Sequence, residues 1–414
     1  MKSNYKPIGN YIRLVDERNK GLKHSNLLGV SISKQFIPSV ANIIGTDMAN
    51  YKIIRKNQFA CSTMQVRRDK KMPVALYLEN EPSIISQAYP IFEIVNTEEL
   101  LPEYLMMWFT RSEFDREACF NAVGGVRGSL EWEDFCNMQL PIPSIEKQEE
   151  IVKEYHILVD RIDLNNQLIV KLEETAQAIY KQWFVDFEFP NENGLPYKSN
   201  GGEMEFCEEL DKEIPVGWKL IPIKDFCKEM KSGGTPSRIE EEYWNSNDIP
   251  WIKTGEISNN ILVSAEEYIS EAGLKGSSAK LLPVNTVLMA MYGVTAGQIG
   301  FLKFPSTTNQ ACCGMICKSV NEAAFLYFYL LANQQYISSL SIGGAQPNLS
   351  KALIENLLLI KPTDDILSKN PLKIIIDNFE NLTNDNSIVT KVSNLLLSKM
   401  ATIETKKKLV KINV

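Results

Sequence analysis

The stretch GGVRGSLEWEDFCNMQLPIPS, residues 124–144, is matched later in the chain by GGAQPNLSKALIENLLLIKPT, residues 343–363. The opening glycine pair and the leucine, asparagine and proline positions that follow it keep their offsets at a displacement of 219 residues. Upstream, ISQAY (residues 85–89) corresponds to TNQAC (residues 308–312) at a displacement of 223. Self-similarity at this scale predicts two domains of one fold, each of about 145 residues.

A pattern of a different kind fills the segment between the two copies. Apolar residues there follow one another in alternating steps of four and three, and the only polar member is an asparagine: Ile151, Tyr155, Leu158, Ile162, Asn165, Ile169, Leu172, Ala176, Ile179 and Trp183. Such a heptad seam predicts one long helix, on the order of 60 Å at ~1.5 Å per residue.

A less regular seam follows the second copy, with members Leu372, Ile375, Phe379, Leu382, Asn386, Val389, Val392, Leu396, Met400 and Ile403. A lone amphipathic helix of this length is marginal in water, so we expect it to pair antiparallel with the first long helix. Asn165 and Asn386 each lie 14 residues after the start of their seam. Pairing with matched centres would bring the two amides together, set the helix register and thereby fix the spacing of the two domains.

The repeated segments mix short β-rich runs, such as residues 89–95 and 286–293, with helical runs, such as residues 101–118 and 322–340. The predicted fold class is therefore α+β, with two similar globular domains separated by a long antiparallel pair of coiled-coil helices. The expected segments are a first domain, a central region with the long helix and a linker, a second domain and a C-terminal helix, with bounds 1–143, 144–214, 215–362 and 363–414.

Charge is unevenly distributed along the chain, although the formal net charge is −7. Residues 1–75 hold 14 basic and 4 acidic side chains, whereas residues 76–143 hold 3 and 12, and residues 144–214 hold 7 and 17. Neutralisation of phosphates by Lys and Arg supplies most of the non-specific affinity of proteins for DNA. A basic half beside an acidic segment favours DNA on one face and protein partners elsewhere.

Several kinds of chemistry lack their sequence signature. The chain has no Pro-Pro-aromatic motif of an adenine methyltransferase and no G-x-x-x-x-G-K-[ST] phosphate loop. His24 and His156 are the only histidines, and the eight cysteines form no C-x-x-C pair. No apolar run reaches the roughly 18 residues of a membrane helix. We therefore expect a cytoplasmic chain without a catalytic centre, metal or membrane contact.

The central stretch IEKQEEIVKEYHILVDRIDLNNQLIVKLEETAQAIYKQWFVDFEFP, residues 145–190, with GLPYKSNGGEME and IPVGWKLIPI after it, resembles the central conserved region of type I restriction-modification specificity subunits. GGTPSRIEEEYWNSNDIPWIKTGEIS (residues 233–258), TNQA and GGAQPNLS are similar to the second target-recognition domain of those subunits. The resemblance covers nearly the whole chain in the family's order. It departs at SKNPLKIIIDNFENLTNDN (residues 368–386), which replaces the usual glutamine-containing helix start.

This resemblance implies that each domain reads one half of a bipartite DNA sequence. In that family, two modification subunits dock on the helices and domains, bind S-adenosylmethionine and methylate adenine. Restriction subunits use ATP and Mg to translocate and cut DNA. The expected partners are thus double-stranded DNA, two modification subunits and restriction subunits, and no cofactor is expected in this chain. Because the two domains differ in nearly every candidate contact, the target should be asymmetric.

Reading base pairs in the major groove requires hydrogen-bonding side chains in exposed turns. The candidate DNA contacts of the first domain are Lys34, Gln35, Arg67, Arg68, Lys70, Lys71 and Arg127. Those of the second domain are Lys231, Thr235, Arg238, Lys253, Tyr292, Gln310, Gln346 and Asn348. Each could equally be a solvated surface group, and Thr235 and Asn348 suit a turn or helix cap better than a base contact. Residues 67–71, which hold four cations, form the stronger phosphate site.

Two other interpretations stay open at this point. The chain could be a protein–protein assembly scaffold without DNA readout, which a salt-dependent gel shift with the modification subunit would discriminate. It could also be an enzyme of an unrecognised class, for which methyl transfer or nuclease activity of the isolated chain would be the evidence.

Overall fold

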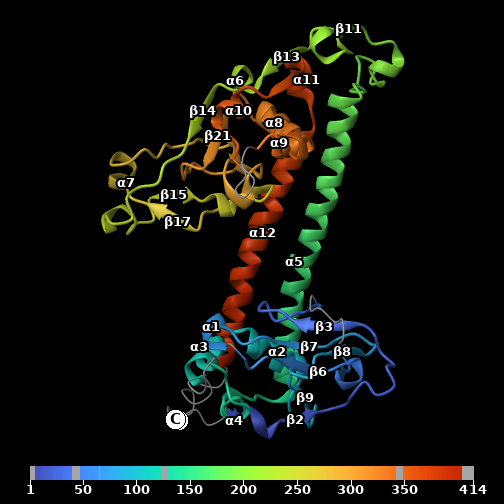
Figure 1. Cartoon of the computed structure of the whole chain (residues 1–414), viewed down its shortest axis with the longest axis vertical. Coiled ribbons are helices and arrows are strands. Elements are labelled where there is room, and N and C mark those ends of the chain that lie inside the picture. Colours follow the sequence, from blue (N-terminus) through green and yellow to red (C-terminus); the bar gives the residue numbers. More distant parts are fainter. Residues whose placement is uncertain (1–4, 40–46, 65, 123–127, 342–347, 403–414) are drawn as a thin grey trace, which may run out of the picture. The chain divides into compact units, whose positions relative to one another are not determined.

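The computed structural model describes residues 5–39, 47–64, 66–122, 128–341 and 348–402 (Figure 1). Internal contacts divide the chain into two compact units. Unit 1 comprises Met1–Ile162 and Ile388–Val414, and unit 2 comprises Asp163–Ser387. Each unit therefore contains one copy of the internal repeat and one part of each long helix.

The strands of unit 1 are short: β1 Tyr5–Pro7, β2 Ile12–Val15, β3 Leu27–Val30, β4 Phe36–Pro38, β5 Lys52–Ile54, β6 Gln58–Cys61, β7 Val74–Leu76, β8 Ser83–Ile85, β9 Ile91–Ile94 and β10 Gln139–Pro141. One sheet has the order β2-β9-β6-β7 and is antiparallel throughout. The other has the order β4-β3-β8-β5, in which only β3 and β8 run parallel. A separate antiparallel pair joins β1 to β10.

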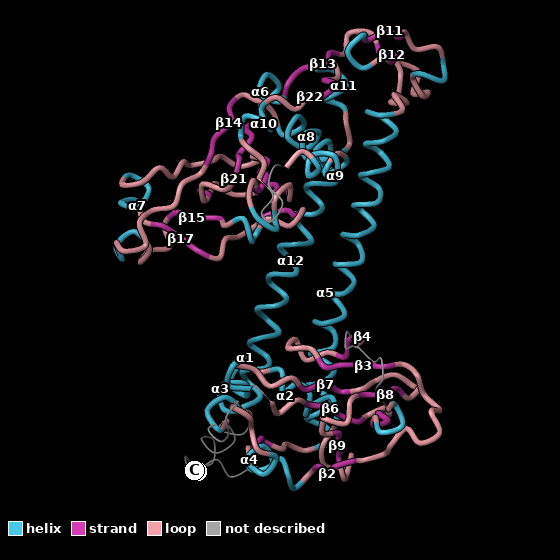
Figure 2. The backbone as a smooth tube through the Cα atoms, viewed as in Figure 1, coloured by secondary structure: helices cyan, strands magenta, loops and turns pink. Residues whose placement is uncertain are grey.

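The strands of unit 2 are β11 Met204–Cys207, β12 Lys212–Pro215, β13 Lys219–Pro222, β14 Glu229–Ser232, β15 Ile249–Ile252, β16 Asn260–Leu262, β17 Glu267–Ile269, β18 Val287–Ala290, β19 Ile299–Leu302, β20 Thr307–Thr308, β21 Cys312–Ile316 and β22 Leu358–Lys361. They form a sheet of order β14-β21-β18-β19-β16, a sheet of order β17-β15-β20, and the pairs β11–β12 and β13–β22. Figure 2 shows how loops join these strands within each unit.

The two units share one topology, as the sequence repeat predicts. The antiparallel order β2-β9-β6-β7 corresponds to β14-β21-β18-β19. In the second sheet of each unit, a central strand lies antiparallel to one neighbour and parallel to the other: β3 between β4 and β8, and β15 between β17 and β20. The pairs β1–β10 and β13–β22 also correspond, and β10 and β22 begin 219 residues apart, at Gln139 and Leu358. The units differ at their margins, where β5 joins β8 but β16 joins β19.

Helices cover the sheets in both units. The shorter helices are α1 Val66–Asp69, α2 Pro102–Thr110, α3 Ser112–Asn121, α4 Trp132–Asn137, α6 Ile223–Phe226, α7 Glu271–Lys275, α8 Val320–Ala332, α9 Gln334–Ser339, α10 Lys351–Glu355 and α11 Asp364–Lys369. In unit 1, Phe109 of α2 packs edge-on against Phe59 of β6 at 5.9 Å between ring centroids. In unit 2, Tyr327 of α8 packs edge-on against Phe301 of β19 at 5.8 Å. The predicted α+β class is thus present in both domains.

The first long helix, α5, spans Ile145–Tyr180 and continues into a π-helical turn at Lys181–Val185. Its 36 residues correspond to about 54 Å at 1.5 Å per residue. Every member of the predicted seam is buried or half-buried, whereas most other side chains from residue 151 to residue 175 are exposed. The 3.5-residue periodicity therefore identifies the packed face of α5.

The second long helix, α12, spans Leu372–Lys399. Within unit 2 it lies beside α5, and the two mid-seam asparagines meet there. Asn165, only 1% exposed, donates from Nδ2 to Asn386 Oδ1 at 2.8 Å and to Asp385 Oδ2 at 2.7 Å. Asn386 donates in turn to Asn166 Oδ1 at 2.9 Å. The pairing expected from matched seam centres is present.

The segment that departs from the family pattern, residues 368–386, covers the end of α11 and the first half of α12. Asn370, which is 5% exposed, accepts the Leu372 amide hydrogen at 3.1 Å through Oδ1 and donates to the Leu367 carbonyl. This asparagine therefore acts as a cap for the helix and ties it to α11.

The far end of α12 differs from the predicted seam. Val392, a predicted seam member, is 44% exposed, whereas its neighbours Ser393 and Leu397 are buried; the predicted member Met400 is buried as expected. Leu397 and Met400 join the hydrophobic core of unit 1. The buried positions move by one residue from Val392 and Leu396 to Ser393 and Leu397, because the helix there packs onto the globular core of that unit. Ile403 lies outside the described residues.

Candidate nucleic-acid interface

The four predicted cations of the first domain lie in and directly after α1. Arg67, Arg68, Lys70 and Lys71 are all exposed. Arg68 forms an ion pair with its neighbour Asp69 at 2.6 Å, so part of its charge is already neutralised. Within the described ranges, the other three form no ion pair. This cluster therefore offers cations to phosphates at little desolvation cost.

The backbone of this cluster is anchored to the start of the repeated segment. The amide of Arg67 donates to the carbonyl of Gly128 at 3.2 Å. Gly128 has a φ of +66°, and an added Cβ would lie 2.6 Å from the Cβ of Arg67. Glycine is required there because of both the conformation and the close approach. The neighbouring candidate Arg127 lies outside the described residues.

Lys34 has an internal role that its residue type did not predict. Its side chain is 6% exposed and its Nζ lies 2.7 Å from Asp115 Oδ1. Nζ also donates to the Phe109 carbonyl and lies 4.9 Å from the centre of the Phe114 ring. Burial lowers the pKa of Lys34, and the partner Asp115 opposes that effect. The ammonium group is thus engaged inside the domain, while the next candidate, Gln35, is exposed.

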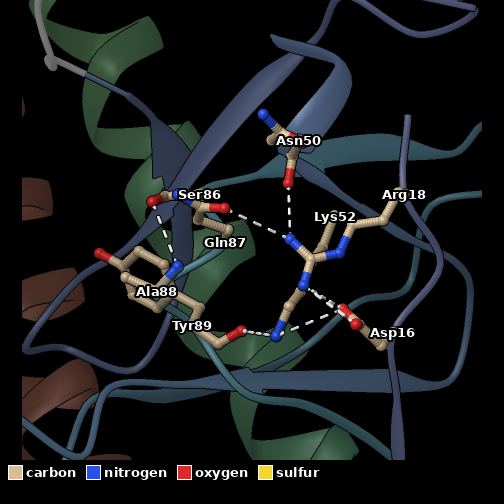
Figure 3. A network of polar contacts seen from close by, with 8 residues as sticks. All are labelled: Asp16, Arg18, Asn50, Lys52, Ser86, Gln87, Ala88 and Tyr89. Atoms are coloured by element: carbon tan, nitrogen blue, oxygen red, sulfur yellow. Dashed lines mark hydrogen bonds and ion pairs between the residues drawn. The ribbon is translucent and has the colours of Figure 1, made fainter. Parts of the chain in front are cut away.

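A polar network that the sequence analysis missed surrounds the turn after β8 (Figure 3). Arg18 is its centre: Nη2 contacts Asp16 at 2.9 Å, and Nη1 donates to the Asn50 carbonyl at 2.8 Å and to Gln87 Oε1 at 3.5 Å. The hydrogen bond from Arg18 lowers the pKa of Asp16. Lys52 donates to the Tyr89 carbonyl at 2.9 Å. The match of ISQAY with TNQAC was the available signal for Gln87.

In the second domain, two predicted residues touch each other. Thr235 Oγ1 donates to Gln310 Oε1 at 2.5 Å. The loop that carries Thr235 packs directly on the turn that carries Gln310, since Gly234 donates its amide to the Thr308 carbonyl at 2.8 Å. A Cβ on Gly233 would lie 2.2 Å from the Asn309 carbonyl oxygen, so only glycine fits this contact.

Backbone pairing brings two further candidates to the same turn. Tyr292 and Asn348 form an isolated antiparallel bridge. The amide of Met291 donates to the Ala311 carbonyl at 2.8 Å, which places this bridge beside the turn of Gln310. Tyr292 and Asn348 are both exposed. Gln346 lies outside the described residues.

The three predicted cations of the second domain, Lys231, Arg238 and Lys253, contact acidic or aromatic neighbours. The Arg238 guanidinium lies 3.5 Å from the Trp244 ring centre and 2.6 Å from Glu267. Lys253 contacts Glu267 at 2.9 Å, and these hydrogen bonds from Arg238 and Lys253 lower the pKa of Glu267. Lys231, on the edge strand β14, pairs with Glu229 at 3.0 Å. The candidates thus fall into a polar turn, a cation–aromatic cluster and one separate lysine.

Among the described residues, no group of three His, Cys, Asp or Glu side chains is arranged to hold a metal ion. No helix in the described part of the chain combines the length and apolarity needed to cross a membrane. The eight cysteines are free thiols. Burial raises the pKa of several of them, including Cys61 and Cys313, the latter to about 12.

Comparisons with known proteins agree with this architecture. The family described as "Type I restriction modification DNA specificity domain" matches residues 42–174 and 215–397. The HindI specificity subunit of Haemophilus influenzae is 24% identical over 404 residues, which cover 84% of this chain and 86% of that subunit. The MjaIX specificity subunit of Methanocaldococcus jannaschii is 25% identical over 317 residues, which cover 74% and 70%.

Among solved structures, the S subunit of the type I restriction-modification system from M. genitalium matches with a TM-score of 0.55 at 14% identity, covering 96% of this chain and 95% of that one. At that identity the match shows a common fold. The family match, by contrast, extends over most of the chain and includes both copies of the repeat. The chain therefore belongs to the type I restriction-modification DNA specificity family.

Proposed function

We propose that this chain is the specificity subunit of a type I restriction-modification complex and reads an asymmetric, two-part DNA sequence. The observation that carries the proposal is the pair of domains with one topology and different exposed side chains. A common scaffold presents an exposed cation cluster and the half-buried Arg18 in one domain, and the exposed Thr235, Tyr292 and Arg238 in the other. Unlike hydrogen-bonding groups on a common scaffold suit two unlike half-sites.

Charge supports DNA as the ligand of the first domain. The residues from 67 to 71 bring four cations onto one exposed segment. Contacts between such cations and phosphates give affinity and orientation but carry no sequence information. Base readout then falls to polar groups in the turns, such as those around Gln310 in the second domain.

The catalytic steps belong, in this proposal, to partner subunits. Two modification subunits would bind S-adenosylmethionine and methylate adenine in the target. Restriction subunits would use ATP and Mg to translocate and cut DNA. The specificity chain would bind no cofactor and would place these subunits on the target sequence in the cytoplasm. The family assignment and the long paired helices, which offer a docking surface, support this division of labour.

Selection from a pool of random duplexes tests the proposal. The chain, co-purified with its modification subunits, would be incubated with the pool, and the bound duplexes would be sequenced. The proposal predicts enrichment of two unlike short sequences at one fixed separation, and binding that weakens steeply as salt rises. An assembly scaffold without DNA readout would retain no enriched sequence, and that result would refute the proposal.

A further inference from the structure

Two glutamines occupy the same turn in the two domains. Gln87 stands two residues after the end of β8, and Gln310 stands two residues after the end of β20. The strands β8 and β20 hold the same place, parallel to β3 and β15. The sequence match of ISQAY with TNQAC aligns the same two glutamines. Both side chains are exposed, so neither is needed to fill a core.

The turns themselves are built alike. In the first domain, Ser86 Oγ accepts the amide hydrogen of Ala88 at 3.4 Å (Figure 3). In the second, Asn309 Oδ1 accepts the amide hydrogen of Ala311 at 3.2 Å. In each case a short polar side chain fixes the backbone on both sides of the glutamine. The two domains therefore present this residue on the same local frame.

A neighbour from an equivalent loop holds each glutamine by its amide oxygen. Arg18, three residues after the end of β2, donates to Gln87 Oε1 at 3.5 Å. Thr235, three residues after the end of β14, donates to Gln310 Oε1 at 2.5 Å. Since β2 and β14 correspond, the donor position is common to both domains although its residue type is not. The acceptor is glutamine in both domains, whereas the donor is arginine in one and threonine in the other.

This arrangement limits what the glutamines can bind. A guanidinium group only donates, so the atom of Gln87 that faces Arg18 is the oxygen. Within the described parts of the chain, no hydrogen bond from Nε2 of Gln87 or Gln310 is present, which leaves the two N–H groups of each as donors. A bidentate pair with adenine would need the amide oxygen as acceptor, and one lone pair of that oxygen already faces Arg18 or Thr235, whereas a phosphate needs only the N–H donors. Phosphate oxygens accept hydrogen bonds from glutamine and occur at every base step.

We propose that Gln87 and Gln310 each donate an Nε2 hydrogen bond to a backbone phosphate, at the equivalent place in the two half-sites. They set the position of each domain on the duplex and read no base. The differing residues beside them, Arg18 and Thr235, are free to differ because they serve unlike half-sites. The inference rests on the proposed function, since it requires both domains to bind DNA.

Binding measurements on the complex of the full chain with its modification subunits test this inference. Fluorescence anisotropy would compare the target duplex with duplexes that carry one changed base pair in either half-site. Gln87→Ala and Gln310→Ala should each weaken binding to every duplex by roughly tenfold, the effect of one hydrogen bond to a charged group. The ratio between changed and unchanged duplexes should stay constant. The salt slope should also stay constant, because a neutral amide releases no counterion.

Gln139→Ala provides the matched control, because Gln139 is an exposed glutamine of β10. Gln87→Glu and Gln310→Glu keep the acceptor oxygen but place a negative charge toward the phosphate, so they should weaken binding more than alanine does. Thermal melting of each variant, compared with the wild-type chain, would reveal a folding defect that weakens binding indirectly. Loss of discrimination at one base pair, or affinity equal to that of the control, would overturn the inference. If the wild-type complex shows no sequence preference, the proposed function fails instead.

Discussion

The contact between the two long helices gives a quantitative prediction. Asn165→Ala removes two hydrogen bonds from a site that is 1% exposed, one to the Asp385 carboxylate and one to the Asn386 amide oxygen. A hydrogen bond to a charged group contributes about 1.5–3 kcal/mol and a neutral one about 0.5–1.5 kcal/mol. We therefore expect the free energy of unfolding of unit 2 to fall by about 2–4 kcal/mol.

Urea-induced unfolding, followed by tryptophan fluorescence, measures this loss. Asn384→Ala is the control, because Asn384 is exposed on the partner helix α12, next to Asp385, and should change stability by less than about 0.5 kcal/mol. A double-mutant cycle of Asn165→Ala with Asn386→Ala should give a coupling energy of about 0.5–3 kcal/mol. An effect of Asn165→Ala no larger than that of the control, together with zero coupling, would refute the argument that this amide pair stabilises the helix register.

Three further predictions concern DNA binding, stability and catalysis. Replacing Arg67, Arg68, Lys70 and Lys71 together with Ala should weaken DNA binding and flatten its salt dependence by up to ~0.9 log units per lost phosphate contact, whereas an unchanged slope would show that the cluster does not touch DNA. Lys34→Ala should destabilise the first domain by about 3–5 kcal/mol in urea unfolding, because it leaves the buried carboxylate of Asp115 unpaired, and a change below 1 kcal/mol would contradict the importance of this pair. The purified chain alone should neither transfer labelled methyl groups to DNA nor cut it, and methyl incorporation by the chain alone would disprove this expectation.

The predictions about the fold rested on the periodic spacing of apolar residues and on the internal sequence repeat. Apolar spacing located the packed face of α5, and the equal offsets of Asn165 and Asn386 within their seams predicted that the two would meet. The same spacing was wrong by one residue at Val392 and Leu396, because there the globular core of unit 1 selects the buried side of α12, although the predicted member Met400 is buried. Local sequence holds no information about that core.

Contacts between distant residues explain what the sequence could not predict at the candidate interface. Lys34 was expected to contact DNA because it is a hydrogen-bond donor in a predicted turn, but the ammonium group instead pairs inside the domain with Asp115, 81 positions away. Arg18 and Gln87 are 69 positions apart and meet only because the loop after β2 lies beside the turn after β8. Residue type therefore gave the list of candidate DNA contacts, and contacts within the folded domain determine which of these side chains are free to bind DNA.

The methylation pattern of the host DNA is the most direct test of whether this chain selects an asymmetric, two-part DNA sequence. Single-molecule sequencing would map methylated adenines in the host with this gene, without it and with it restored. Two-part DNA readout by this chain predicts adenine methylation within one asymmetric motif, made of two unlike halves at a fixed separation, which disappears on deletion and returns on restoration. An unchanged methylation pattern after deletion, or loss of a palindromic motif instead, would contradict it.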